Sequence, residues 1–207
     1  MKRLMVFLIV FVALVICISC SRTVKDVDGN VYHTVQIGEQ LWLKENLKTT
    51  HFADGSDIAL SNNKSSTNIG YRYTPGNSEA NVEEYGYLYN YAVVKDTRGV
   101  CPKGWHVPSE AEFEELLTFV KKTYAEEDEE YIGRYLTEND HGTNESGFSA
   151  MLAGSYYDKT AKSVEYMDIE GQYWSYDMSV LDMCQWLADV QPSSRRNAHS
   201  IRCVKDK

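Results

Sequence analysis

The sequence predicts an α+β domain that contains two helices and an antiparallel sheet. Three observations indicate this class: β-rich segments with tight turns near the N-terminus, two stretches of helical periodicity in the middle, and short β-like segments towards the C-terminus. Strands and helices that occupy separate parts of a chain are typical of α+β folds, whereas regular alternation is typical of parallel α/β folds. No internal repeat is visible in the 207 residues.

The chain begins with a segment that is typical of an export signal. Lys2 and Arg3 precede an apolar run from Leu4 to Ile18, and small residues follow it. The run is shorter than the roughly 20 residues that a membrane-spanning helix needs. We therefore expect a signal peptide over residues 1–19.

The signal ends in the letters CISC, Cys17 to Cys20. This ending resembles the bacterial lipobox, in which a small residue precedes the cysteine that is lipidated; Cys17 stands where an aliphatic residue is usual. We expect lipidation of Cys20, a short tether at residues 20–22, and acyl chains that hold the protein on a membrane of the bacterial cell envelope, at the outer membrane or the cell surface. The alternatives are ordinary secretion and an uncleaved anchor.

The charge balance excludes one class of partner. The formal net charge is -9, and removal of residues 1–19 takes away Lys2 and Arg3, which makes it -11. Binding to a phosphate backbone requires clustered lysine and arginine. The sequence therefore argues against nucleic acid as a partner. The remaining residues have the length of one domain, which we place at residues 23–207.

The first part of this domain, Val24 to Leu47, is predicted to form strands joined by tight turns. Asp28-Gly29 lies between β-rich runs, a pair typical of a two-residue hairpin. A second turn is expected at Gly38-Glu39. A calcium loop at DVDGN is the alternative, but the later ligands of such a loop are missing. A long polar loop is expected from residue 53 to residue 80.

A first helix is predicted from Val82 to Val94, with Asn81 as its cap and acidic residues in its first turn. Its apolar face is expected to belong to the core and consists of Tyr85, Leu88, Tyr89, Ala92 and Val93.

A second helix begins after Ser109, because Glu112 follows three residues later and completes a capping box. The acidic run from Glu126 to Glu130 is expected to be a solvated loop or helix end, with a cation site as the alternative. The apolar face of this helix consists of Phe113, Leu116, Leu117, Val120 and Tyr124.

Five short strand-like segments are predicted in the C-terminal part, where glycines and polar turns separate them. They are Phe148–Leu152, Ser163–Ile169, Gln172–Tyr176, Cys184–Val190 and His199–Asp206.

Three cysteines remain in the exported domain: Cys101, Cys184 and Cys203. In an oxidising compartment two of the three are expected to pair. A bridge between Cys101 and Cys203 would close a loop of about 100 residues, for which the chain-entropy model gives up to about 4.7 kcal/mol. The sequence alone leaves the connectivity open. Cys184 lies in an alternating apolar pattern beside Trp186, which favours a buried free thiol.

The familiar catalytic and metal-binding signatures are absent from the sequence. Cys101 and His106 are not followed by a second pair of ligands at a zinc-like distance. The sequence contains no phosphate-binding glycine loop, no nucleophile elbow and no zinc-protease motif. We therefore predict no catalytic residue, no metal and no cofactor, and we do not expect an enzyme. His106 is expected to make a structural hydrogen bond, while Trp105 and Val107 enter the core.

Several motifs together resemble the Fibrobacter succinogenes major paralogous domain. DVDGNVYHTVQIGEQLWLKENLKT, YGYLYNYAVV, CPKGWHVPSEAEF, NESGFSA, YWSY and SIRCV follow one another in the order of that family, from Thr23 to about Val204. The family is similar to C-type lectin-like folds and to formylglycine-generating domains. The resemblance implies a C-type lectin-like core with a short twisted antiparallel sheet and long irregular loops. It also implies a disulfide between Cys101 and Cys203.

The resulting functional hypothesis is a lipid-anchored binding or adhesion module whose ligand is a carbohydrate or another surface protein. A structural component of a surface assembly without a small ligand is the alternative. An oxidase of the formylglycine-generating kind is more remote, because it requires a pair of thiols and Cys184 is left alone once Cys101 and Cys203 pair. The Glu-Pro-Asn set of calcium-dependent lectins is absent, and Trp174 to Asp177 only loosely matches a Trp-Asn-Asp element.

Overall fold

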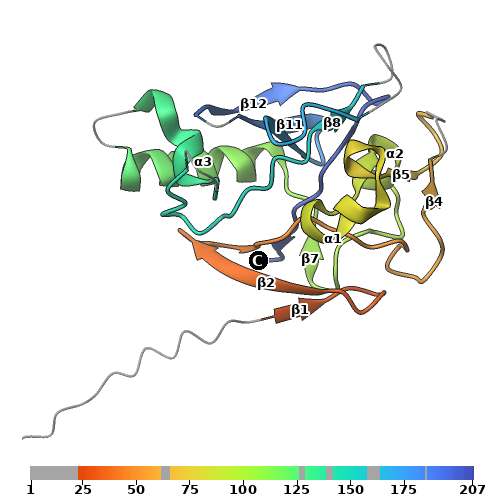
Figure 1. Ribbon diagram of the computed structural model, residues 1–207. Helices are drawn as coiled ribbons and strands as arrows, with labels where there is room; N and C mark the ends of the chain where they lie inside the picture. The colour runs from red at the N-terminus through yellow and green to blue at the C-terminus, as the bar shows by residue number, and fades with distance from the viewer. Residues whose placement is uncertain (1–22, 62–65, 126–128, 139–141, 158–163, 185) are drawn as a thin grey trace, which may run out of the picture.

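The computed structural model describes residues 23–61, 66–125, 129–138, 142–157, 164–184 and 186–207 (Figure 1). The predicted signal peptide, with Cys17 and Cys20, lies outside these residues, as does most of the acidic run at 126–130. The domain is a mixed α and β fold with few helices, as predicted, but the described residues form three curled sheets instead of one. No helix in the described ranges is long and apolar enough to cross a membrane.

A five-stranded antiparallel sheet contains both ends of the domain, because the last strand pairs with strands near the start of the chain. Its strand order is β1-β2-β3-β14-β7. The strands are β1 (Thr23–Lys25), β2 (Val31–Ile37), β3 (Gln40–Leu43), β14 (Val204–Lys205) and β7 (Trp105–His106).

Both turns predicted in this region are present. The first hairpin has a loop longer than the expected two residues, since Lys25 pairs with Val31. The carboxylate of Asp26 accepts hydrogen bonds from the backbone N–H groups of Asp28 and Asn30 and so fills the loop. The second turn has two residues between paired Ile37 and Gln40.

Two other sheets form the upper part of the molecule (Figure 1). One has the order β4-β5-β6-β13-β8-β9 and is antiparallel except for the parallel pair β4 and β5. Its strands are β4 (Ala59–Leu60), β5 (Tyr71–Tyr73), β6 (Leu88–Asn90), β13 (Ala198–His199), β8 (Ser155–Tyr156) and β9 (Val164–Glu165). The other is antiparallel and consists of β10 (Glu170–Trp174), β11 (Ser179–Cys184) and β12 (Ala188–Pro192). Short 3-10 helices lie at η1 (Pro75–Asn77), η2 (Glu79–Asn81) and η3 (Glu129–Tyr135).

The prediction of one continuous helix over residues 82–94 is wrong. The chain forms α1 (Val82–Tyr85), then strand β6, then α2 (Tyr91–Val94). Gly86 ends α1 with a φ of 72°, and a Cβ at this position would lie 2.6 Å from the backbone oxygen of Leu47. The apolar stripe does belong to the core, because Leu88, Tyr89 and Val93 are buried. The residues of the stripe are spaced as in one helix, but they belong to a strand and to the two short helices on either side of it.

The second predicted helix is confirmed as α3 (Glu110–Tyr124). The Ser109 side chain accepts a hydrogen bond from the Glu112 backbone N–H, and the Glu112 side chain accepts one from the Ser109 backbone N–H. Phe113, Leu116 and Val120 are buried against the core, where the Phe113 ring stacks on Trp42 with centroids 5.6 Å apart.

The C-terminal strands differ from the predicted segments. The segment predicted as one strand from Cys184 to Val190 belongs to two, because it starts at the last residue of β11 and ends within β12, and Met183 pairs with Ala188. The segment Phe148–Leu152 contributes only an isolated bridge at Ala150. The segment Ser163–Ile169 contains only the short strand Val164–Glu165, and His199–Asp206 is divided between the short strands β13 and β14. The segment Gln172–Tyr176 corresponds to β10, which has the predicted length but lies two residues earlier, at Glu170–Trp174.

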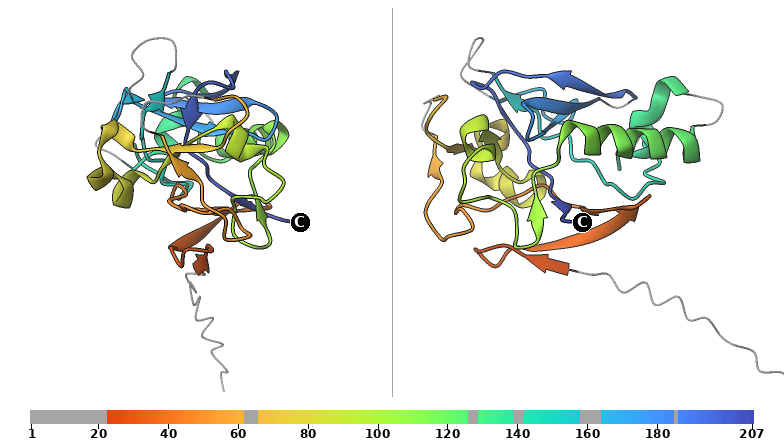
Figure 2. Two further views of the ribbon diagram at one scale, coloured as in Figure 1. Left: turned by 90° about the vertical axis from the view of Figure 1, so that its right-hand side faces the viewer. Right: turned by 180° about the vertical axis from the view of Figure 1, so that it is seen from behind.

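The segment between β13 and β14 connects all three sheets (Figure 2). Ser200 donates its backbone N–H to the Gln172 oxygen, and its own oxygen accepts from Trp174 in β10. Further along, the oxygens of Ile201 and Cys203 accept from Leu47 and Leu43. We call residues 198–205 the central segment.

Arg202 lies in the middle of the central segment and is completely buried. Its guanidinium donates hydrogen bonds to the backbone oxygens of Phe148 and Ser149 and to the side-chain oxygen of Asn46. The charge also lies 4.5 Å from the centroid of the Phe148 ring and 5.2 Å from that of Tyr173. Burial lowers the pKa of Arg202. Carbonyl dipoles and aromatic faces therefore replace the water that a charged group loses on burial.

The conformation of Gly86 gives a first prediction. We expect Gly86→Ala to lower the free energy of unfolding by about 3 kcal/mol or more, because it combines left-handed strain with a backbone collision. Gly29→Ala is the matched control: Gly29 has a φ of 84°, but no atom lies within 4 Å of the added Cβ. The control is expected to lose only about 1 to 2 kcal/mol, the cost of a left-handed backbone at a non-glycine residue. Urea denaturation measures both, and equal losses would contradict the packing explanation.

Candidate binding pocket

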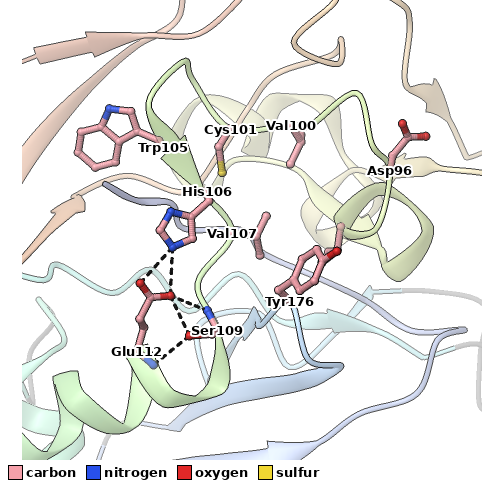
Figure 3. Close-up of a pocket in the computed structure, with 11 residues that line it drawn as sticks. Asp96, Val100, Cys101, Trp105, His106, Val107, Ser109, Glu112 and Tyr176 are labelled. Atoms are coloured by element: carbon pink, nitrogen blue, oxygen red, sulfur yellow. Dashed lines mark hydrogen bonds and ion pairs between the residues drawn. The ribbon is translucent and has the colours of Figure 1, made fainter. Parts of the chain in front are cut away.

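A pocket of about 330 Å³ lies beside the N-terminal end of α3 (Figure 3). We call it the α3 pocket. It is formed by the end of α2 with the turn that follows it, by the segment from Val100 to Val107, by the first residues of α3, and by Tyr176 from the loop after β10.

The floor of the pocket is apolar and fixed. Val100, Cys101 and Val107 are buried, and Figure 3 shows Val107 between His106 and Tyr176, with Cys101 and Val100 above them. Cys101 forms a disulfide with Cys203, 102 residues away, which is the pairing implied by the resemblance. The disulfide attaches the floor to the central segment, so the pocket is held in place by the same part of the chain that connects the sheets.

His106 separates the pocket from the C-terminal residues of the chain. Its Nδ1 lies 2.7 Å from Oδ1 of Asp206, and its Nε2 lies 3.0 Å from Oε1 of Glu112. The expected structural hydrogen bond is therefore present, with two carboxylate partners. Cys101 is bonded to Cys203 and cannot be a zinc ligand. Within the described ranges, no group of three or more His, Cys, Asp or Glu side chains could hold a metal ion.

Glu112 is held in its ionised form by its neighbours. Burial raises the pKa of Glu112, but hydrogen bonds from the Ser109 backbone, His106 and the Ser109 hydroxyl outweigh burial and lower the pKa below 4.5. The same carboxylate thus completes the helix cap and fixes the imidazole ring. Glu112 therefore links the start of α3 to His106 in the pocket wall.

The rim of the pocket carries polar and aromatic groups. Asp96 accepts from Nε and Nη2 of Arg98, at 2.8 and 2.7 Å, which is a bidentate pair. Tyr176 is 47% exposed, and Lys95 Nζ lies 3.3 Å from the centroid of its ring. Trp105 was predicted to enter the core. It is only half-buried and lines the pocket. Asp96, Trp105 and Tyr176 line the pocket, so the rim offers a carboxylate acceptor and aromatic surface, while Arg98 and Lys95 lie beside it.

Sequence reasoning missed Asp96, Arg98 and Tyr176. Asp96 and Arg98 belong to the turn after α2, beyond the predicted helix end at Val94, in a stretch for which the sequence made no prediction. Tyr176 was predicted to end a strand, but its backbone N–H donates to the Pro108 oxygen and so brings the ring to the start of α3. The signal that could have found these residues is an exposed aromatic residue next to a turn, which is too common to be specific.

The other residues considered for chemistry have structural roles. Trp174 is buried and donates its indole N–H to the Tyr89 oxygen, so it is not part of a sugar-binding surface. Asp177 accepts from the Glu110 backbone N–H at the start of α3. Cys184 is a free cysteine, as expected, but it is only half-buried. With Cys101 and Cys203 bonded, the described part of the chain holds no pair of free thiols.

The role of Glu112 gives a second prediction. We expect Glu112→Gln to lower the free energy of unfolding at pH 7 by about 1 to 2 kcal/mol, because it weakens the helix cap and removes the charge facing His106. Because folding lowers the pKa of Glu112, its ionised carboxylate stabilises the fold when the pH is above the ordinary carboxyl pKa of 4.5. This stabilisation is lost as the pH falls through the lowered pKa. The difference in free energy of unfolding between Glu112→Gln and the parent protein should therefore become smaller below about pH 4.5. Urea titrations across pH measure it.

Glu114→Gln is the control for this experiment. Glu114 is exposed on the same helix and lies outside the capping box. A loss of stability as large for Glu114→Gln as for Glu112→Gln would mean that helix charge alone, and not the contacts of Glu112, explains the effect.

Comparison with known proteins identifies the family. The Fibrobacter succinogenes major domain family matches residues 35–205, which include every residue of the α3 pocket. Neither a search of curated proteins nor a search of solved structures finds a match. Because the family match covers most of the chain, this protein belongs to the Fibrobacter succinogenes major domain family.

Proposed function

We propose that this protein is a lipoprotein of the bacterial cell envelope whose exported domain binds carbohydrate in the α3 pocket. The observation that carries the proposal is the combination in one open pocket of an apolar floor, aromatic side chains and a polar rim. A sugar ring has an apolar face and a rim of hydroxyl groups. Small-molecule sites in general combine apolar walls with a few polar groups that set orientation.

The geometry of the rim supports a neutral, polyhydroxylated ligand. Each hydroxyl group both donates and accepts hydrogen bonds. Asp96 lines the pocket, so its carboxylate can accept a hydrogen bond from a sugar hydroxyl. Arg98 lies beside the pocket and orients this carboxylate with two hydrogen bonds, while its third nitrogen donates to the Ser56 hydroxyl. Tyr176 supplies exposed ring surface on which an apolar sugar face can pack.

The rigid floor also supports binding. A site that is already in its bound shape loses little conformational freedom when a ligand enters. The disulfide between Cys101 and Cys203, together with the contacts of His106 to Glu112 and Asp206, fixes the floor and one wall.

The proposed location rests on the sequence. The signal over residues 1–19 and the lipobox-like ending at Cys20 support export and lipidation, with acyl chains that anchor the protein at the outer membrane or cell surface. We further propose that the fold is C-type lectin-like. Strands from both ends of the domain in one sheet, a disulfide to the last strands and long irregular loops support this assignment.

A glycan-array screen of residues 21–207, with and without calcium, followed by calorimetric titration of each hit, tests the proposal. We expect binding to at least one neutral glycan, and we expect Tyr176→Ala to weaken it about tenfold or more, since aromatic anchors contribute most to such sites. Tyr131→Ala is the control, because Tyr131 is 38% exposed and lies outside the pocket.

Two results would contradict the proposal. Binding to no glycan under either condition would remove the carbohydrate ligand. An equal loss of affinity in Tyr176→Ala and Tyr131→Ala would place the ligand elsewhere on the domain.

A second candidate function is contact with another surface protein in an assembly. The observation that favours it is a cluster of exposed apolar side chains at the turn between β11 and β12, formed by Tyr131, Trp186 and Leu187. The Tyr131 and Trp186 rings meet edge to face, with centroids 6.2 Å apart. The Gly133 backbone N–H donates to the Trp186 oxygen and holds the turn against η3. Loss of self-association or of pull-down partners in Trp186→Ser would support this role.

A further inference from the structure

Two more hollows follow α3 away from the pocket. The nearer one, of about 230 Å³, lies between the first turn of α3, strand β3 and the C-terminal residues; we call it the middle hollow. The farther one, of about 460 Å³, lies between α3 and the turn that joins β2 to β3; we call it the far hollow. Glu112 lines both the α3 pocket and the middle hollow, while Glu39 and Gln40 line both the middle and the far hollow.

The helix forms one continuous side of the three hollows. Glu112, Glu115, Phe119 and Lys122 are separated by three or four residues, so they lie along one face of α3. From Glu112 to Lys122 this face extends about 15 Å, at 1.5 Å per residue. Figure 1 shows the end of β2 and the C-terminus below α3. The α3 pocket and the two hollows therefore form one elongated surface, which we call the α3 groove.

The opposite wall is built to approach the helix closely. Gly38 has a φ of 57°, and a Cβ on it would lie 2.9 Å from the ring of Phe119. A glycine thus allows the turn to rest on Phe119, whose ring forms part of the far hollow. Gln40 donates its side-chain N–H to the backbone oxygen of Glu112 at 2.9 Å and ties the end of the turn to the helix. These two contacts hold the β2–β3 turn, which forms one wall of the far hollow, against α3.

The middle and far hollows are each lined by both acidic and basic side chains. Lys122 and Lys205 face the same hollows as Glu39 and Glu115. A strongly acidic or basic chain would meet like charges in each hollow, whereas a neutral ligand with many hydroxyl groups finds donors and acceptors throughout. Phe119 adds apolar surface at the end distant from Tyr176.

We infer that the ligand is a neutral linear oligosaccharide that occupies the α3 pocket at one end and extends along α3 to Phe119. This inference rests on the proposed function and specifies its ligand class. Between the pocket and the middle hollow the chain crosses the contact of His106 with Asp206, whose side chains are 39% and 55% exposed. Several sugar units are needed to cover the groove, so affinity is expected to grow with the length of the oligosaccharide until it reaches Phe119.

Isothermal titration of the full exported domain with neutral glucan, mannan and xylan ladders, each from disaccharide to hexasaccharide, tests the inference. We expect the hexasaccharide of the recognised series to bind about tenfold or more tightly than the disaccharide. Phe119→Ala should remove most of this gain and leave disaccharide affinity unchanged. Leu117→Ala is the matched control, since Leu117 packs on the same core from the same helix but does not line the far hollow.

A second variant keeps the test decisive if Phe119→Ala unfolds the domain. Thr118 is exposed and lines the far hollow, so Thr118→Trp blocks it without a change in the core. Length-independent binding, or an unchanged length dependence in Thr118→Trp, would overturn the inference while leaving carbohydrate binding at the pocket intact. Binding only to acidic glycans would also overturn it. Failure of every ladder and of the array would remove the proposed function itself.

Discussion

Hydrogen bonds from one short stretch of backbone hold the three sheets together. The central segment, residues 198–205, pairs with β6 and β8 in the six-stranded sheet and with β3 and β7 in the five-stranded sheet. Between these strands it exchanges hydrogen bonds with Gln172 and Trp174 of the three-stranded sheet. Each sheet alone is small, and most of its strands have two to five residues. Their stability therefore depends on the segment they share.

Two features make this segment a fixed support for the groove. Arg202 brings a buried charge into the core, where backbone oxygens, Asn46 and two aromatic rings replace contacts with water. A buried polar group of this kind permits few alternative packings, because each one would leave its partners unpaired. The neighbouring Cys203 bonds to Cys101 in the pocket floor. Core packing and pocket geometry are thus coupled through adjacent residues.

Structural elements that are determined by a few neighbouring residues could be predicted from the sequence. Ser109 and Glu112 predicted the start of α3, and Gly38 predicted a tight turn. Prediction failed over residues 82–94, because Leu88 and Tyr89 are buried on both faces of β6 and so match helical spacing by chance. The pocket was predictable only in part: the disulfide followed from the family resemblance, but the contact of His106 with Asp206 spans 100 residues. Contacts set by tertiary structure leave no local pattern.

The central segment is expected to make the three sheets a single cooperative unit. Native-state hydrogen exchange tests it directly at the backbone N–H groups of Leu43, Leu47 and Trp174, which all donate to this segment. Groups that open only with the whole domain exchange with the free energy of global unfolding. We expect these three N–H groups to share one common opening free energy. A clearly lower value at Trp174 than at Leu43 and Leu47 would show that the three-stranded sheet opens independently and would contradict it.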